Sequence, residues 1–433
     1  MASAFPNTSS SGKIPVAHYV AGMTESYPNT HRKRIIETSI NNRITEDVLP
    51  INGSVSQILT DKYIEFRLKS TEGFFIDLAS LCLEMDLTIT KPNGEVLGDE
   101  AQDMCVLANG ISNTLFKSVN VYFNDRLVES CPIYNYVSYV KMLKTLSPDK
   151  LSTLGICAGY VDEGDGGAEV TYTAPRVKLA TVKGAQVCFP LLLDIATLDM
   201  YLLDKVDVRI RLEIANRDWY LGYVSNRTPQ VQITKAILWV DKVIPQANAM
   251  LALNDSLKQQ PIEYVFDKTL VKTYIMGATE GGIVMEQPFN NIIPEKLTMV
   301  ILDNGNFNGA LDRNPLAFKA LDISEICITI NGQTAYRQTH NMRGYYDNIK
   351  AIGLEHDHMI TYKSFSKNRA VYTFNFNNED MKGAVPVEMA GHLRISLTLS
   401  ATQDRPHIII LMADSVGILN IDRDRHIHCD VRS

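Results

Sequence analysis

Apolar and more polar residues alternate along much of the chain from residue 63 onward, which is the spacing of half-buried β-strands. The run 81–89 is the clearest example, with every second residue apolar. Glycine and asparagine turns separate the segments, so the chain is predicted to be all-β, as a sandwich or a barrel. Further strands are predicted at 64–68, 119–128, 206–214, 231–243, 271–275, 297–302, 326–330, 371–376, 393–399 and 408–412.

Helical spacing occurs in a few connections between these strands. Apolar residues over 133–143 fall on one helix face. Ser147 and Pro148 then predict the N-cap and first position of a short second helix that ends at Gly155. The helix-prone stretch 247–257 is interpreted as the connection between two β-rich bodies.

Other segments show no sustained period. Residues 1–54 are rich in Ser, Asn and Thr and are interpreted as a flexible N-terminal arm. The segment 155–184, which contains the acidic run 162–167, predicts a long loop that serves contacts. Asparagine and glycine at 304–309 predict another loop.

Three patterns in the first half of the chain return in the same order in the second half. Alternating strands resemble one another, so chance similarity is the alternative to duplication. Duplication divides the chain into the arm and two bodies, 55–245 and 246–433. The matched segments are 119–128 with 326–332, 208–214 with 393–399, and 238–243 with 411–416.

The charge balance limits the classes of partner. The 433 residues include 42 Lys and Arg against 49 Asp and Glu, a formal net charge of −7. Tight phosphate binding comes from Lys and Arg that release counterions, so any contact with DNA should be local. No apolar run approaches the ~20 residues of a membrane-spanning helix, and no secretory signal is visible, so we expect a protein made and kept inside cells.

Candidate chemistry is sparse. The seven cysteines are scattered without a Cys-x-x-Cys pair, so we expect reduced, mostly buried thiols. The pairs His356 with His358 and His426 with His428 are interpreted as surface or interface histidines, and no metal is predicted. Motifs for serine, zinc-protease and nucleotide chemistry are absent from the sequence, so no catalytic or cofactor residue is assigned. Two acids on distant strands would leave a glycoside hydrolase as an alternative.

Two side-chain patterns remain to be weighed. Arg32, Lys33 and Arg34 lie in the predicted arm and are candidates for contact with nucleic acid or for a role in assembly. A nuclear import address and packing against a neighbouring subunit are the alternatives. The aromatic stripe over 372–376 predicts core packing rather than a base-stacking platform.

Segments spread over most of the chain resemble the major capsid proteins of Polinton/Maverick elements and adintoviruses. They include the tyrosine-bearing helix Tyr134-Asn-Tyr-Val-Ser-Tyr139 and the ending Ile421-Asp-Arg-Asp-Arg425. The other segments that carry the resemblance are 64–66, 75–79, 113–125, 201–208 and 302–318.

The resemblance implies a double jelly roll: two tandem eight-stranded barrels with short helices in the connections. It further implies a virion capsid protein of a double-stranded DNA virus or virus-like element, whose homotrimers form pseudo-hexameric capsomers of an icosahedral shell. Implied partners are neighbouring capsomers, penton and minor capsid proteins, and genome DNA through the arm. No small-molecule substrate, cofactor or catalytic residue is implied. We expect deletion of residues 1–45 to leave the trimer intact and to impair higher assembly.

Three alternatives remain. A single-jelly-roll vertex, penton or fibre protein would leave the second set of strand patterns unexplained. A carbohydrate-binding β-sandwich of secreted origin would usually carry a signal or disulfides. An enzyme would require a concave site with perturbed carboxylates or histidines.

Overall fold

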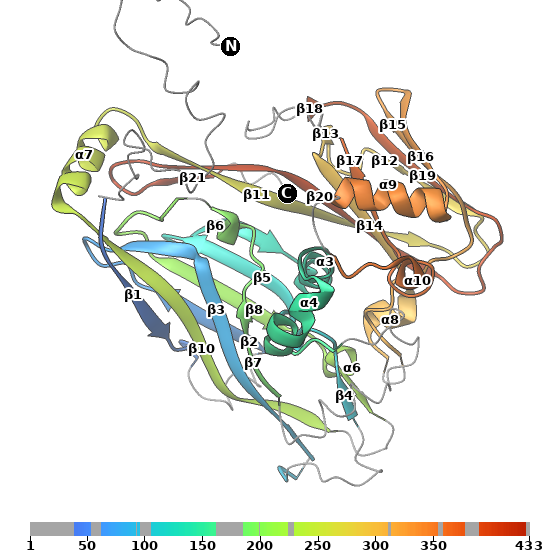
Figure 1. The fold of residues 1–433 in the computed structure, drawn as a ribbon, viewed down its shortest axis with the longest axis horizontal. Helices are drawn as coiled ribbons and strands as arrows, with labels where there is room; N and C mark the ends of the chain where they lie inside the picture. The colour runs from blue at the N-terminus through green and yellow to red at the C-terminus, as the bar shows by residue number, and fades with distance from the viewer. Residues whose placement is uncertain are drawn as a thin grey trace, which may run out of the picture. The chain divides into compact units, whose positions relative to one another are not determined.

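The computed structural model describes ten segments of the chain, and its elements belong to one compact unit, Ile40–Ser433 (Figure 1). The predicted acidic run 162–167 and residues 1–38 of the predicted arm lie outside the described residues. The described segments are 39–52, 62–91, 93–95, 105–161, 185–198, 200–223, 229–310, 313–353, 358–376 and 389–429.

The first half of the chain forms two four-stranded antiparallel sheets, which we call the first sheet pair. One has the order β1-β10-β3-β7 and the other the order β2-β8-β5-β6. The strands are β1 (Ile40–Val48), β2 (Tyr63–Leu68), β3 (Phe75–Thr90), β5 (Phe116–Phe123), β6 (Arg126–Cys131), β7 (Ala185–Pro190), β8 (Val208–Ile214) and β10 (Gln230–Pro245).

The second half forms the second sheet pair with the same connectivity. Its sheets have the orders β11-β20-β14-β17, with β21 (Ile427–Cys429) added on β20, and β12-β19-β15-β16. Apart from β21, each strand of the second sheet pair therefore has a counterpart in the first half, which confirms the duplication. The strands are β11 (Ile262–Met276), β12 (Gly282–Glu286), β14 (Lys296–Asp303), β15 (Ile323–Ile330), β16 (Gln333–Gln338), β17 (Val371–Asn375), β19 (Leu393–Leu399) and β20 (His407–Ile421).

Two further pairs of short strands complete the described sheets: β4 (Cys105–Leu107) with β9 (Leu221–Tyr223), and β13 (Ile292–Ile293) with β18 (Met389–Ala390). Short helices lie in the connections (Figure 1). They are α2 (Ile111–Thr114), α3 (Tyr134–Thr145), α4 (Pro148–Lys150) with a π-helical turn at Leu151–Gly155, a 3-10 turn at Ile195–Thr197, α6 (Arg217–Tyr220), α7 (Ala247–Leu257), α8 (Asn304–Asn308), α9 (Met342–Ile352) and α10 (Tyr362–Phe365).

Local chemistry explains both predicted hairpins. Asn124 and Asp125 join β5 to β6, and Asn331 and Gly332 join β15 to β16. All four residues have positive φ, as a tight two-residue hairpin turn requires. The predicted helices at 133–143 and 247–257 are confirmed as α3 and α7. Among the described residues, no helix is long and apolar enough to cross a bilayer.

Three predictions differ from the structure. Residues 40–48, included in the predicted arm, form β1, whose residues are mostly exposed and so lack an apolar period. The predicted loop at 304–309 contains α8, because Asp303 caps it by accepting a hydrogen bond from the backbone N–H of Gly305 at 2.7 Å. All seven cysteines lie in the described residues and none is part of a disulfide, but only Cys105 and Cys131 are buried, because most of the others lie on outward-facing positions.

Alternating side chains fill the space between the sheets. In β3 and β10 every second residue is buried over long stretches, as expected for strands that cover a core on one face. The predicted aromatic stripe is confirmed as core, since Tyr372 and Phe374 are buried and the partly buried Phe376 packs against the same core.

Candidate functional site

The junction between the first and second sheet pairs holds a buried polar network. Helix α3, which follows β6, lies between the two sheet pairs (Figure 1). Its Tyr136 ring stacks on Phe307 of α8 with centroids 5.5 Å apart, and Tyr139 meets Phe318 edge-on at 5.8 Å. Trp219 donates a 2.9 Å hydrogen bond from Nε1 to the hydroxyl of Tyr136. Buried aromatic pairs each contribute about 1 kcal/mol of stability beyond their burial, so the contacts of this helix stabilise the association of the two sheet pairs.

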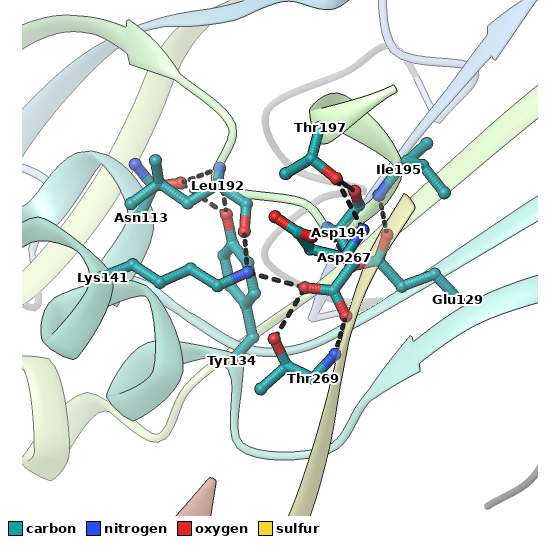
Figure 2. A network of polar contacts seen from close by, with 10 residues as sticks. All are labelled: Asn113, Glu129, Tyr134, Lys141, Leu192, Asp194, Ile195, Thr197, Asp267 and Thr269. Atoms are coloured by element: carbon teal, nitrogen blue, oxygen red, sulfur yellow. Dashed lines mark hydrogen bonds and ion pairs between the residues drawn. The ribbon is translucent and has the colours of Figure 1, made fainter. Parts of the chain in front are cut away.

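Asp194 connects the two sheet pairs through its carboxylate (Figure 2). Lys141 of α3 donates from Nζ to Oδ1 at 2.6 Å. The backbone N–H of Thr269 on β11 donates to Oδ2 at 2.6 Å, and the Thr269 hydroxyl donates to Oδ1 at 2.9 Å. Next to it, the hydroxyl oxygen of Thr197 accepts the N–H of Asp267 at 3.0 Å. Because β11 is an edge strand, these acceptors satisfy backbone N–H groups that a neighbouring strand would otherwise bind.

Glu129 on β6 holds the turn that carries Asp194. Its two carboxylate oxygens accept hydrogen bonds from the backbone N–H groups of Asp194 and Ile195, both at 3.0 Å. The side chain is buried, and this burial, together with the negative charge of Asp194, raises the pKa of Glu129 to about 8 against the opposing effect of Lys141. Burial disfavours the charged form of Lys141, but the negative charge of Asp194 outweighs this effect and raises the pKa of Lys141 to about 12.

Tyr134 fixes the same turn from the other side. Its hydroxyl donates to Oδ1 of Asn113 at 2.6 Å and accepts the backbone N–H of Leu192 at 3.0 Å (Figure 2). Asn113 in turn donates from Nδ2 to the carbonyl of Pro190 at 3.1 Å. Burial raises the pKa of Tyr134, so its hydroxyl keeps the proton that it donates.

A second pair of charged side chains lies where α3 reaches the second sheet pair. Lys144 donates from Nζ to the hydroxyl of Thr298 on β14 at 2.5 Å. Burial lowers the pKa of Lys144 and raises that of Asp414 on β20, although each group's charge opposes the shift of the other. The two groups therefore stabilise each other's charged forms.

The C-terminal segment also crosses the junction. Arg425 donates from Nη2 to Oδ1 of Asp204 at 2.5 Å and from Nε to its carbonyl at 2.8 Å. Asn124 of the first hairpin donates to the carbonyl of Arg425 at 3.0 Å. This segment contains the ending whose sequence carries the family resemblance, and it ties the second sheet pair to the first.

A cavity of about 480 Å³ opens beside this network, between β6 and β11. Glu129 and Asp194 line it together with Lys268 and Lys272. Each carboxylate oxygen of Glu129 and Asp194 already accepts a hydrogen bond or ion pair from the protein. These contacts therefore position β11, and they occupy every carboxylate oxygen of Glu129 and Asp194.

The residues singled out from the sequence lie elsewhere. Arg32, Lys33, Arg34 and His356 are outside the described residues. His358 accepts the N–H of Ile360 at its Nδ1, His426 pairs with Asp422 at 3.1 Å, and His428 is exposed on β21. Within the described ranges, no group of three His, Cys, Asp or Glu residues is arranged to hold a metal ion.

Sequence reasoning missed the junction network. Glu129, Asp194 and Thr269 come from separate strands and turns, and their proximity depends on tertiary structure. One local signal was available, because Lys141 and Lys144 fall three residues apart on a helix whose other residues are largely apolar or aromatic. Such lysines need carboxylate partners where the helix is buried.

Neither a protein-family model nor a curated protein matches the sequence. Solved structures match in fold over nearly the whole chain. A cryo-EM structure of the Sputnik virophage gives a TM-score of 0.61 at 12% identity, covering 99% of this chain and 94% of that chain. The Faustovirus major capsid protein gives 0.59 at 10% identity, with 94% of each chain covered. The PBCV-1 virus capsid gives 0.56 at 14% identity, covering 93% of this chain and 100% of that chain.

The fold is a double jelly roll. In this double jelly roll, the first sheet pair is the first barrel and the second sheet pair is the second barrel. The fold class implied by the sequence resemblance is thereby confirmed. The junction network lies where the two barrels meet.

Proposed function

We propose that the chain is a major capsid protein of a double-stranded DNA virus or virus-like mobile element. One observation carries the proposal: the strand order of the two four-stranded sheets in the first barrel returns in the second barrel, as the two orders β1-β10-β3-β7 and β11-β20-β14-β17 illustrate. Two similar lobes in each chain allow three chains to form a six-sided capsomer. The likeness in fold to structures titled as viral capsids and a major capsid protein supports this function.

The junction network supports a structural role. The hydrogen bonds of Glu129, Asp194 and Lys141 hold the barrels in one relative arrangement. A subunit that tiles a closed shell needs such a fixed geometry, because an error in the angle between lobes is repeated in every capsomer. The proposal assigns no catalytic residue, cofactor or metal.

We propose a homotrimer that contacts neighbouring capsomers, penton and minor capsid proteins within the virion capsid. Genome DNA is a proposed partner of the arm through Arg32, Lys33 and Arg34. Membership of the Polinton/Maverick–adintovirus group is also proposed, on the segments quoted above. The first barrel would end at residue 245, and the second would run from 246 to 433.

The experiment that tests this function measures the mass of the purified chain by light scattering and native mass spectrometry, followed by negative-stain microscopy. We expect a mass near three times 48.4 kDa, with six-sided particles or closed shells. A stable monomer at micromolar concentration would contradict the proposal. It would favour the carbohydrate-binding alternative.

A further inference from the structure

Two cysteine side chains meet on the outer face of the first barrel. Cys82 lies on β3 and Cys188 on the edge strand β7, and their Sγ atoms are 3.4 Å apart. The strand register places Cys82 opposite Pro190 and Cys188 opposite Glu84, so the two cysteines are diagonal neighbours across adjacent strands. The residues that flank each cysteine in its strand are buried, which directs both thiols away from the core.

Solvent reaches the two thiols to different degrees. Cys188 is exposed, whereas Cys82 is half-buried. Burial, and then the hydrogen bond with Cys188 and the charge of that thiol, raise the pKa of Cys82 to about 12. Cys82 therefore keeps its proton at neutral pH, and Cys188 is the thiol that a reagent in solution contacts first.

The acid beside the pair already has partners. Glu84, which lies opposite Cys188, forms an ion pair with Lys235 and accepts a 2.8 Å hydrogen bond from Nε1 of Trp239. A metal ion bound by the two sulfurs would have to compete with these partners for the carboxylate. Two thiols in contact are instead the reactants of disulfide formation.

A third thiol lies within electrostatic range of the pair. The negative charge of the exposed Cys157 contributes to the raised pKa of Cys82. The sulfur in contact with Cys82 is nevertheless that of Cys188. Cys157 is therefore the competing partner that an experiment must separate from Cys82.

The strand spacing determines how firmly a bond between the two sulfurs would hold. Diagonal neighbours on antiparallel strands lie about 7–8 Å apart, slightly beyond the usual Cα separation in a disulfide. Closing the bond therefore draws β7 toward β3, and β7 can respond because it is paired on one side only among the described strands. Strained or exposed disulfides are the ones that thiols in solution reopen. The position therefore favours a reversible bond over a permanent one.

We propose that Cys82 and Cys188 are a site of reversible oxidation, at which a small-molecule disulfide such as oxidised glutathione closes a bond between β3 and β7. The inference goes beyond the proposed function and does not depend on it. In a reducing medium the pair stays as two thiols, and in an oxidising medium the bond fastens the edge strand of the first barrel.

The reaction consists of two thiol–disulfide exchanges. The thiolate of Cys188 attacks one sulfur of the small disulfide, which forms a mixed disulfide on Cys188 and releases the other half as a thiolate that takes up a proton. Cys82 then gives its proton to solvent, and its sulfur attacks the Sγ of Cys188. The second half of the small disulfide leaves and is protonated. The protein loses two hydrogen atoms in total, and the small disulfide gains them as two thiols.

The test uses the full-length chain in mixtures of oxidised and reduced glutathione. Iodoacetamide blocks the remaining thiols, and peptide mapping without reductant identifies every linked cysteine. Cys82→Ser and Cys188→Ser each remove one sulfur of the pair, and Cys157→Ser removes the competing thiol. Cys327→Ser is the matched control, because Cys327 is half-buried on β15 of the second barrel. Circular dichroism verifies that each variant folds.

We expect the wild-type map to show Cys82 linked to Cys188, and excess reduced glutathione to reverse the link. Cys82→Ser should stop at the mixed disulfide on Cys188. Cys188→Ser should take up glutathione at Cys82 at least about 10-fold more slowly than the wild-type chain does at Cys188, because Cys82 is half-buried and protonated. Closure should quicken as the pH rises, since Cys82 attacks as a thiolate. Cys157→Ser and Cys327→Ser should keep the link.

Three outcomes would overturn the inference. The wild-type chain could keep a mixed disulfide on Cys188 without closing it, Cys188 could bond to Cys157 instead, or Cys188 could remain unmodified. The wild-type map distinguishes these outcomes by itself, so a serine variant that fails to fold leaves the test intact. None of them bears on the mass of the assembly, which tests the proposed function separately.

Discussion

Glu129 accepts a 3.0 Å hydrogen bond from the backbone N–H of Asp194, so one buried acid positions another whose carboxylate binds the second barrel. The two acids lie close together in a buried site, where Lys141 forms an ion pair with Asp194 at 2.6 Å. Burial and the charge of Asp194 raise the pKa of Glu129 to about 8. The turn that carries Asp194 is therefore held by a group that binds its proton more tightly in the folded chain than in the unfolded chain.

The first prediction concerns pH. Because the pKa of Glu129 is raised above its ordinary value of 4.5, the folded chain keeps this proton where the unfolded chain has lost it. Its stabilising contribution is complete below about pH 4.5 and is lost as the pH rises through about 8. The unfolding free energy of the wild-type chain should therefore fall between about pH 4.5 and about pH 8. Glu129→Gln should make this fall smaller, by up to about 1.4 kcal/mol per pH unit. Urea denaturation at several pH values measures this slope.

The control for this experiment is Glu72→Gln. The side chain of Glu72 is 77% exposed in an ion pair with Lys205, so its loss should leave the slope unchanged. An unchanged slope in Glu129→Gln as well would show that Glu129 does not hold the extra proton.

A second prediction concerns the ion pair across the junction. Lys141→Met removes the cation from Asp194 but keeps the length and most of the apolar stem of the side chain. We expect unfolding free energy to fall by about 3 kcal/mol, since a largely buried carboxylate loses its charged partner. Lys258→Met, at the exposed pair with Asp255, should cost less than about 1 kcal/mol. Equal losses in the two variants would contradict the importance of the junction pair.

A third prediction tests why α9 contains a glycine. A Cβ atom at Gly344 would lie 2.0 Å from the carbonyl oxygen of Thr339, so the helix lies too close to the preceding backbone for any side chain. Gly344→Ala should destabilise the chain by about 1–3 kcal/mol, although alanine favours helices elsewhere. Gly281→Ala is the control, because nothing lies within 4 Å of its added Cβ. Chemical denaturation of both variants gives the comparison.

The sequence predicted the features that local chemistry determines. Asn124-Asp125 and Asn331-Gly332 specify tight turns by residue type alone, and the alternation along β3 follows from its half-buried face. Strand β1 was missed because most of its residues are exposed. Helix α9 was also missed, although Met342, Tyr345 and Ile349 fall at helical spacing.

The junction network could not be read from the sequence for a different reason. Glu129 and Asp194 are 65 residues apart, and Asp194 and Thr269 are 75 apart. Their proximity requires both barrels to be folded and docked. Only the two lysines of α3 gave a local indication that this helix meets acids.

The last prediction concerns the N-terminal arm and corrects the deletion expected from sequence. Removal of residues 1–45 would delete the first part of β1, including Arg43, which pairs with Asp77, and Thr45, whose hydroxyl donates to Asp241 at 2.7 Å. We now expect this deletion to lower thermal stability and to reduce trimer formation, because it removes residues 40–45, which pair with β10. Deletion of residues 1–38 should instead leave the trimer intact and reduce shell assembly, because it removes Arg32, Lys33 and Arg34 but keeps β1. Native mass spectrometry and electron microscopy distinguish these outcomes. If deletion of residues 1–38 abolished the trimer, the arm would have to form the trimer contact. If shells still formed normally, the arm would have no role in assembly.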